Sequence, residues 1–151
     1  MPAGSITMTM RPPDSQSNRP VRKVKFAWTS DAAGAVNGIK TDGTGSPTIV
    51  GVAAAPAFIS GTIVGVTFIP SASAAPTALY DVTLKDDEGV DVLAGQGADL
   101  SATVTTRVKP GQSFKDGTTT SLDPIPIDDV LELVVTNAGN AKQGTVVLYL
   151  R

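Results

Sequence analysis

Cysteine and histidine are both absent from this chain of 151 residues. Without cysteine the chain offers no disulfide scaffold, no thiol nucleophile and no cysteine-based zinc site. Without histidine it lacks the commonest general base and the usual transition-metal ligand. Catalysis would rest on Asp, Glu, Lys, Ser or Tyr, and no set of these residues shows the spacing of a known catalytic site. We therefore expect a protein that is not an enzyme and that uses no cofactor or metal.

Aromatic residues are also scarce, at 5% of the chain against 41% hydrophobic residues in total. The core must therefore be built mainly from aliphatic side chains. Gly and Pro are frequent, with 15 and 11 residues, a composition typical of many short strands joined by turns and unfavourable for helices. A chain of this length supports one domain that buries roughly 70% of its unfolded surface, which removes the need for a disulfide or metal.

Long apolar runs are missing as well. Residues 1–20 contain no apolar core of the length that a signal peptide requires. The longest apolar stretch, residues 49–69, is interrupted by Gly51, Pro56 and Gly61, which argues against a transmembrane helix. We expect a soluble protein made in the cytoplasm without Sec export.

The charge is distributed unevenly along the chain. Residues 1–40 contain six basic and two acidic side chains, whereas residues 41–151 contain six basic and twelve acidic ones, so a basic N-terminal part precedes an acidic body. Such a basic part is typical either of a contact with an acidic partner or of a strand edge that charge protects from aggregation.

The N-terminal segment combines a strand pattern with a linker. Ile6, Met8 and Met10 alternate with threonines, and residues 11–20 then have the composition of a connection. We predict an extended arm over residues 1–20, held by the body or by a neighbouring chain, and a domain over residues 21–151. The candidate partner-binding residues are Ile6, Met8, Met10, Arg11, Arg19, Arg22, Lys23 and Lys25.

The rest of the chain is typical of an all-β domain. Val24, Phe26 and Trp28 alternate with polar neighbours, which predicts a half-buried strand with Trp28 in the core. Asn37-Gly38 predicts a tight hairpin turn. Further strands are predicted over residues 48–52, 61–69, 79–84, 125–127, 131–136 and 145–150, and residues 100–108 form either a strand or a short helix that Ser101 caps. This spacing predicts a single β-sandwich, jelly-roll-like or barrel domain.

The last two of these strands flank a turn-forming sequence, residues 137–141. We predict a C-terminal hairpin whose last strand lies inside a sheet. Asp86-Asp87-Glu88-Gly89-Val90-Asp91 resembles a metal-binding loop but departs from the calcium-loop spacing, so we interpret it as an acidic turn.

Two other candidate sites are weaker. Gly95-Gln96-Gly97 lacks the context of a phosphate-binding loop and predicts a tight reversal. Asp128 and Asp129, with Glu132, are candidates for paired carboxylate chemistry, but adjacent residues of a strand point to opposite faces.

The segments YDVTLKDDEGVDVLAGQGADLS and LELVVTNAGNAKQGTVVLYLR resemble a class of small β-rich virion structural proteins of tailed bacteriophages and prophages. The resemblance covers roughly residues 22–151. It implies a capsid decoration (cement) protein that binds the outside of the assembled head, bridges capsid subunits and carries out no chemistry. The implied partners are the major capsid protein and further copies of this chain, with a trimer favoured, and neither nucleic acid nor membrane is contacted. Alternatives are a neck, tail or fibre component, or a carbohydrate-binding β-sandwich.

Overall fold

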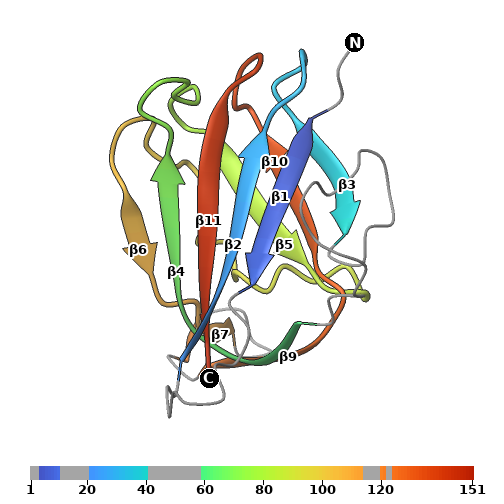
Figure 1. The fold of residues 1–151 in the computed structure, drawn as a ribbon. Helices are drawn as coiled ribbons and strands as arrows, with labels where there is room; N and C mark the ends of the chain where they lie inside the picture. The colour runs from blue at the N-terminus through green and yellow to red at the C-terminus, as the bar shows by residue number, and fades with distance from the viewer. Residues whose placement is uncertain (1–3, 11–20, 41–58, 114–119, 122–123) are drawn as a thin grey trace.

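The computed structural model describes residues 4–10, 21–40, 59–113, 120–121 and 124–151, and within them the chain is all-β (Figure 1). A six-stranded antiparallel sheet has the order β1-β2-β11-β4-β6, and β9 pairs with the other half of β4. A three-stranded sheet, β3-β10-β5, faces it, and β7 and β8 form a separate pair. The strands are β1 (Ser5–Met10), β2 (Arg22–Thr29), β3 (Val36–Lys40), β4 (Ile59–Pro70), β5 (Asp81–Lys85), β6 (Thr106–Val108), β7 (Gln112–Ser113), β8 (Thr120–Ser121), β9 (Ile125–Asp129), β10 (Glu132–Thr136) and β11 (Gln143–Leu150).

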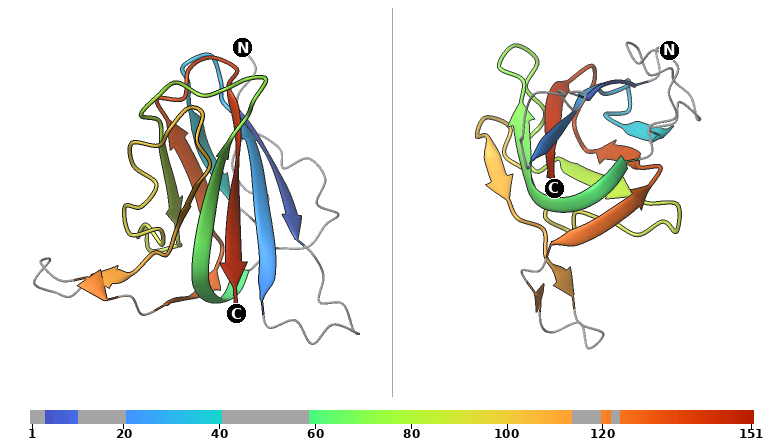
Figure 2. Two further views of the ribbon diagram at one scale, coloured as in Figure 1. Left: turned by 90° about the vertical axis from the view of Figure 1, so that its left-hand side faces the viewer. Right: turned by 60° about the horizontal axis from the view of Figure 1, so that its bottom comes forward.

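The large sheet is organised around its two long central strands. β11 pairs with β2 along its whole length and with β4 on its other side. β4 bends near one end of the molecule (Figure 2), so its second half pairs with β6 and its first half pairs with β9. This bend gives the large sheet two separate edges on the same side of β4. The predicted strand at residues 61–69 is confirmed as part of β4, and it lies between β11 and β6 in the large sheet.

The core lies between the large and the small sheet. Val24, Phe26 and Trp28 of β2 point into it, as their alternation predicted. Leu133 of β10 and the Tyr80 ring that precedes β5 meet them from the other side. The rings of Trp28 and Tyr80 are 5.7 Å apart between centroids. Most of the other core side chains are aliphatic, as the low aromatic content predicted.

The predicted C-terminal hairpin is wrong. β10 belongs to the small sheet and β11 to the large one, so the chain crosses from one sheet to the other between them. Asn137, Gly139 and Ala141 adopt positive φ values there, and the buried Ala138 accepts a hydrogen bond from the N–H of Thr77 at 2.8 Å. The crossing places the apolar faces of both strands in one core. The last strand does lie inside a sheet, as predicted.

The hairpin predicted at Asn37-Gly38 is also wrong, because Val36–Lys40 is one continuous strand. The chain reverses earlier, at Asp31, whose Oδ1 accepts hydrogen bonds from the N–H groups of Ala33 and Ala35 at 2.8 and 2.9 Å. An aspartate that bonds the backbone two and four residues on fixes a turn by itself. The strand predicted over residues 48–52 lies outside the described residues.

Within residues 100–108 the structure has no helix, and only Thr106–Val108 form a strand. Ser101 Oγ accepts hydrogen bonds from the N–H groups of Thr103 and Val104, in the manner of a helix cap. The chain then continues into β6, which pairs with Val66–Phe68 of β4. Pairing with a central strand therefore decides the conformation that the local sequence left open.

The segment predicted as an arm contributes a strand to the large sheet. β1 pairs with β2 from Ser5↔Thr29 to Met10↔Val24. Ile6 and Met8 are buried in the core, at 1% and 2% exposure. The expectation that these two side chains anchor a neighbouring chain is therefore corrected, because they anchor β1 to its own domain. The boundary expected at residue 20 does not separate this strand from the domain, and residues 11–20 lie outside the described part of the chain.

Candidate binding face on the large sheet

The outer face of the large sheet carries a group of basic side chains. The inward direction of Val24 and Phe26 turns Lys23 and Lys25 outward, because side chains alternate along a strand. Strand register places Lys25 beside Val147 of β11, and two residues further along β11 it places Lys23 beside Tyr149. Arg107 of β6 lies in the same row as Lys25, beyond Thr67 of β4. We call Lys23, Lys25, Arg107 and Tyr149 the basic patch.

Two cations of the basic patch meet at the Tyr149 ring. Arg107 approaches from β6, with its guanidinium carbon 4.8 Å from the ring centroid. Lys23 approaches from β2, with its Nζ 5.4 Å from the same centroid. Cations within about 6 Å of an aromatic centroid are attracted by the negative face of the ring. The Tyr149 ring therefore contacts one positive charge from β2 and one from β6.

Hydrogen bonds fix the Arg107 side chain in this position. Its Nη2 donates to the Tyr149 hydroxyl at 2.7 Å, and its Nε donates to Thr67 Oγ1 at 3.1 Å. Thr67 Oγ1 lies 3.5 Å from the same hydroxyl. The hydrogen bond with Thr67, together with the hydrogen bond and charge of Arg107 and the charge of Lys23, lowers the pKa of the Tyr149 phenol below its usual value of 10.0. The buried Tyr80 behaves in the opposite way, since burial raises its pKa to about 12.

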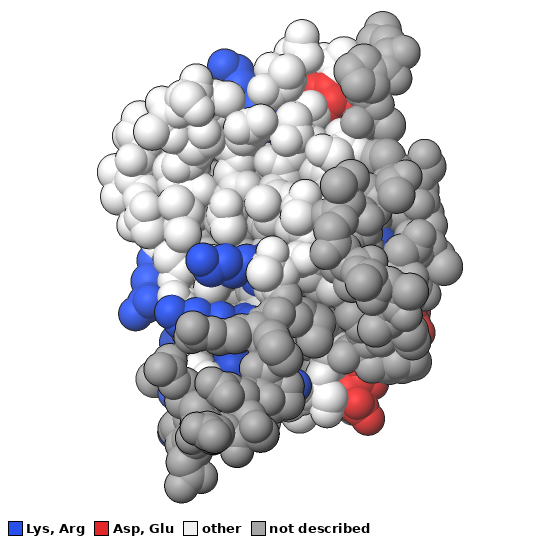
Figure 3. All heavy atoms as spheres, in the orientation of Figure 1, with Lys and Arg blue, Asp and Glu red and all other residues white. Residues whose placement is uncertain are grey.

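Within the described residues these cations have no carboxylate partner. The ion pair found there joins Lys40 and Asp87, at 3.7 Å. In the orientation of Figure 3, the visible Lys and Arg side chains gather mainly over the lower half of the large sheet, and the upper half carries few charges. Arg22 continues the basic side chains at the start of β2, where its Nη2 donates to the carbonyl oxygen of Ser60.

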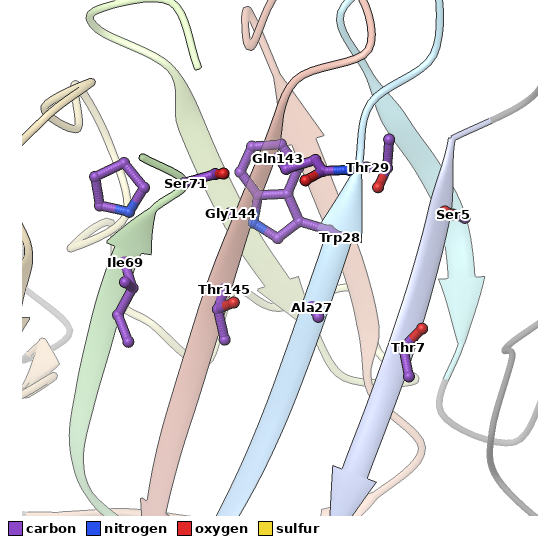
Figure 4. Close-up of a pocket in the computed structure, with 11 residues that line it drawn as sticks. Ser5, Thr7, Ala27, Trp28, Thr29, Ile69, Ser71, Gln143, Gly144 and Thr145 are labelled. Atoms are coloured by element: carbon purple, nitrogen blue, oxygen red, sulfur yellow. The ribbon is translucent and has the colours of Figure 1, made fainter. Parts of the chain in front are cut away.

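An uncharged depression of about 320 Å³ adjoins the basic patch on the same sheet (Figure 4). It exists because the outward residues there are small, for example Ala27 beside Thr7 and Thr145. Trp28 borders it but is only 2% exposed, because its ring turns inward against Gly144. The depression is lined by Ser5, Thr7, Ala27, Trp28, Thr29, Ile69, Pro70, Ser71, Gln143, Gly144 and Thr145. Sugar-binding sites commonly stack an exposed ring on the ligand, and this lining offers none.

The acidic segment Asp86–Asp91 is a turn, as interpreted from the sequence. The N–H of Val90 donates to Asp86 Oδ1 at 2.7 Å. Asp91 accepts hydrogen bonds from the N–H groups of Leu84, Leu93 and Gly95. The described residues contain no group of three or more potential ligands positioned for a metal ion. These two carboxylates therefore serve the backbone of this region.

The glycines that follow also form a reversal, as predicted. Gly95 has a φ of 75°, and the carbonyl of Gly97 accepts a hydrogen bond from the N–H of Val82 at 2.7 Å. Gly97 thus lies against β5 without contributing a phosphate-binding loop.

The carboxylates at the end of β9 do not form a catalytic pair. Asp128 is exposed and Asp129 half-buried on the opposite face of the strand. The N–H of Asp87 donates to Asp129 Oδ2 at 3.2 Å and is the main cause that lowers the pKa of Asp129 below 3.8. Asp129 is therefore ionised at neutral pH and has no proton to donate as a general acid.

The structure divides the predicted partner-binding residues. Lys23 and Lys25 lie on the outer face of β2, Arg22 is exposed at the start of that strand, and Ile6 and Met8 lie in the core. Met10 is in β1, although only its backbone is described, and Arg11 and Arg19 lie outside the described residues. Sequence reasoning missed Arg107, Thr67 and Tyr149. The alternation of buried Val146 and Leu148 could have placed Tyr149 on the outer face, but Arg107 joins it only through the pairing of β6 with β4.

Comparison of the chain with protein-family models, curated proteins and solved structures found no match. In the described residues, no helix is long and apolar enough to span a membrane. The basic patch is accordingly the feature on which a functional argument can be built.

Proposed function

We propose that this protein is a non-enzymatic virion structural protein that decorates the outside of an assembled bacteriophage head and stabilises it by bridging capsid subunits. The resemblance of residues 22–151 supports the class of protein. The observation that carries the binding role is the basic patch, which presents three outward cations on an otherwise acidic molecule. An acidic surface of the major capsid protein is its partner.

The architecture suits a docking surface of this kind. Lys23 and Lys25 stand on β2, which is paired on both sides by β1 and β11, so little backbone order has to be gained on binding. Complementary charge accelerates docking and fixes its register more than it adds affinity. The uncharged depression beside the patch supplies area that a partner can cover without desolvating a charge. A protein that binds only the assembled shell stabilises it by mass action.

Head binding can be tested with a single charge change and a matched control. Expanded heads stripped of accessory proteins are sedimented with the natural chain, with Lys25→Gln, and with Lys85→Gln on the small sheet. We expect saturable binding of the natural chain, weakened by added salt. Lys25→Gln should weaken it about three- to tenfold, and Lys85→Gln should leave it unchanged.

Two results would contradict this proposal. The first is the absence of saturable binding to heads by the folded natural chain. The second is equal binding by Lys25→Gln and the natural chain, which would remove the basic patch from the interface. If the protein binds purified tails instead of heads, the neck or tail alternative replaces decoration.

A further inference from the structure

We propose that Lys23, Arg107 and the Tyr149 hydroxyl together form a binding site for one carboxylate side chain of the partner protein. This inference rests on the proposed function only for the identity of the partner, the capsid protein. The site itself follows from the approach of two cations to one tyrosine ring, at 5.4 and 4.8 Å from its centroid. Lys25 stands next to the site on the same face of β2.

Arg107 is already oriented for this role. The guanidinium has five N–H donors, of which one is used on Tyr149 and one on Thr67. The remaining donors are available to a ligand, and the side chain is exposed. An arginine whose orientation is fixed before binding loses less conformational entropy when it captures a carboxylate. Charge-assisted hydrogen bonds of this type are among the stronger ones in proteins.

The local charge also favours an anion. Lys23 and Arg107 both contact the Tyr149 ring, and no carboxylate among the described residues neutralises either of them. Both positive charges help to lower the pKa of the Tyr149 phenol. The positive charges of Lys23 and Arg107 therefore attract one negative group, and a bound carboxylate would neutralise them.

The surroundings favour a protein carboxylate over nucleic acid. The patch is compact, with three cations, and an uncharged depression adjoins it on the same sheet. Nucleic acid binding draws its affinity from many phosphate contacts along a basic groove or stripe. The acidic balance of residues 41–151 would oppose such a polyanion. A folded partner can instead place one carboxylate on the patch and cover the depression with uncharged groups.

The ionisation of the two tyrosines gives a readout specific to this site. Tyr149 ionises below 10 and Tyr80 at about 12, so absorbance at the phenolate band resolves two steps. The probe is a hexaglutamate peptide with blocked ends, and its affinity at neutral pH is measured by NMR titration. We expect the peptide to raise the midpoint of the Tyr149 step, because a carboxylate at the site opposes formation of the phenolate.

Variants assign the effect to the proposed residues. Arg107→Gln should raise the Tyr149 midpoint by itself, abolish the further effect of the peptide and weaken peptide binding about tenfold. Lys23→Gln should act in the same direction, and Lys85→Gln should resemble the natural chain. Equal affinity of the peptide for Arg107→Gln and for the natural chain would contradict the proposed site. So would an oligonucleotide of equal charge that binds more tightly through the same residues.

Head sedimentation with Arg107→Gln separates this inference from the proposed function. Equal binding of Arg107→Gln and the natural chain to heads would contradict the carboxylate site and would agree with head decoration. Peptide binding that depends on Arg107, combined with no binding to heads, would support the carboxylate site and contradict head decoration.

Discussion

Gly144 determines how the single tryptophan of the chain packs. It lies opposite Trp28 in the pairing of β11 with β2, and the Trp28 ring occupies the space where a side chain at residue 144 would stand. A Cβ atom added to Gly144 would lie 2.5 Å from Trp28 Cζ2 and 2.8 Å from Cε2. The glycine is therefore needed for steric reasons, since its backbone has no positive φ.

Gly144→Ala should lower the free energy of unfolding by about 1–3 kcal/mol, because the buried indole has to shift to admit the methyl group. Gly65→Ala on the adjacent β4 is the matched control, since its Cβ would make only ordinary contacts at 3.7 and 3.8 Å. Urea denaturation followed by Trp28 fluorescence measures both. Equal stabilities of the two variants would contradict this account of the packing.

At the scale of elements, β1 is the strand whose role differs most from its sequence pattern. The alternation of Ile6 and Met8 with threonines predicted a strand, and the structure confirms one. The linker that follows predicted an arm held either by the body or by a neighbouring chain. Pairing of β1 with β2 over six positions, with both apolar side chains in the core, instead makes it the edge of the large sheet.

Ile6→Ala should therefore destabilise the isolated domain by about 2–5 kcal/mol, the usual cost of a cavity at a buried isoleucine. Thr7→Ala, one residue further and exposed, should change stability by less than about 0.5 kcal/mol. Thermal unfolding of the purified chain measures both without any partner. An Ile6→Ala variant as stable as the natural chain would show that β1 is not held by its own domain. Removing residues 1–20 would remove this core contact too, so it is a poor test of binding.

The sequence predicted individual strands better than their partners. Alternation identified β2, because burial of one face leaves a local signal, and apolar, β-rich composition identified the long β4 and the last strand. The C-terminal hairpin failed because Asn, Gly and Ala at residues 137–141 suit a crossing between sheets as well as a hairpin, and the choice depends on distant strands. The contact of Arg107 with Tyr149 could not be predicted for the same reason, because it exists only through the pairing of β6 with β4.

At the scale of the whole molecule, the basic patch and the acidic turn lie on different surfaces. The basic patch occupies the outer face of the large sheet, and the acidic turn Asp86–Asp91 follows β5 of the small sheet. Because the two sheets pack face to face, the basic patch and the acidic turn belong to different sides of the sandwich. Such a molecule has a preferred orientation toward an acidic surface, and the central claim is that the large sheet faces the partner.

Lysine footprinting on the head-bound protein tests that claim most directly. The protein is acetylated free and bound to stripped heads, and the modification of each lysine is read by mass spectrometry. We expect Lys23 and Lys25 to react more slowly in the bound state, while Lys85 on the small sheet reacts equally in both. Unchanged reactivity of Lys23 and Lys25, together with protection of Lys85, would show that the opposite face binds and would contradict the account.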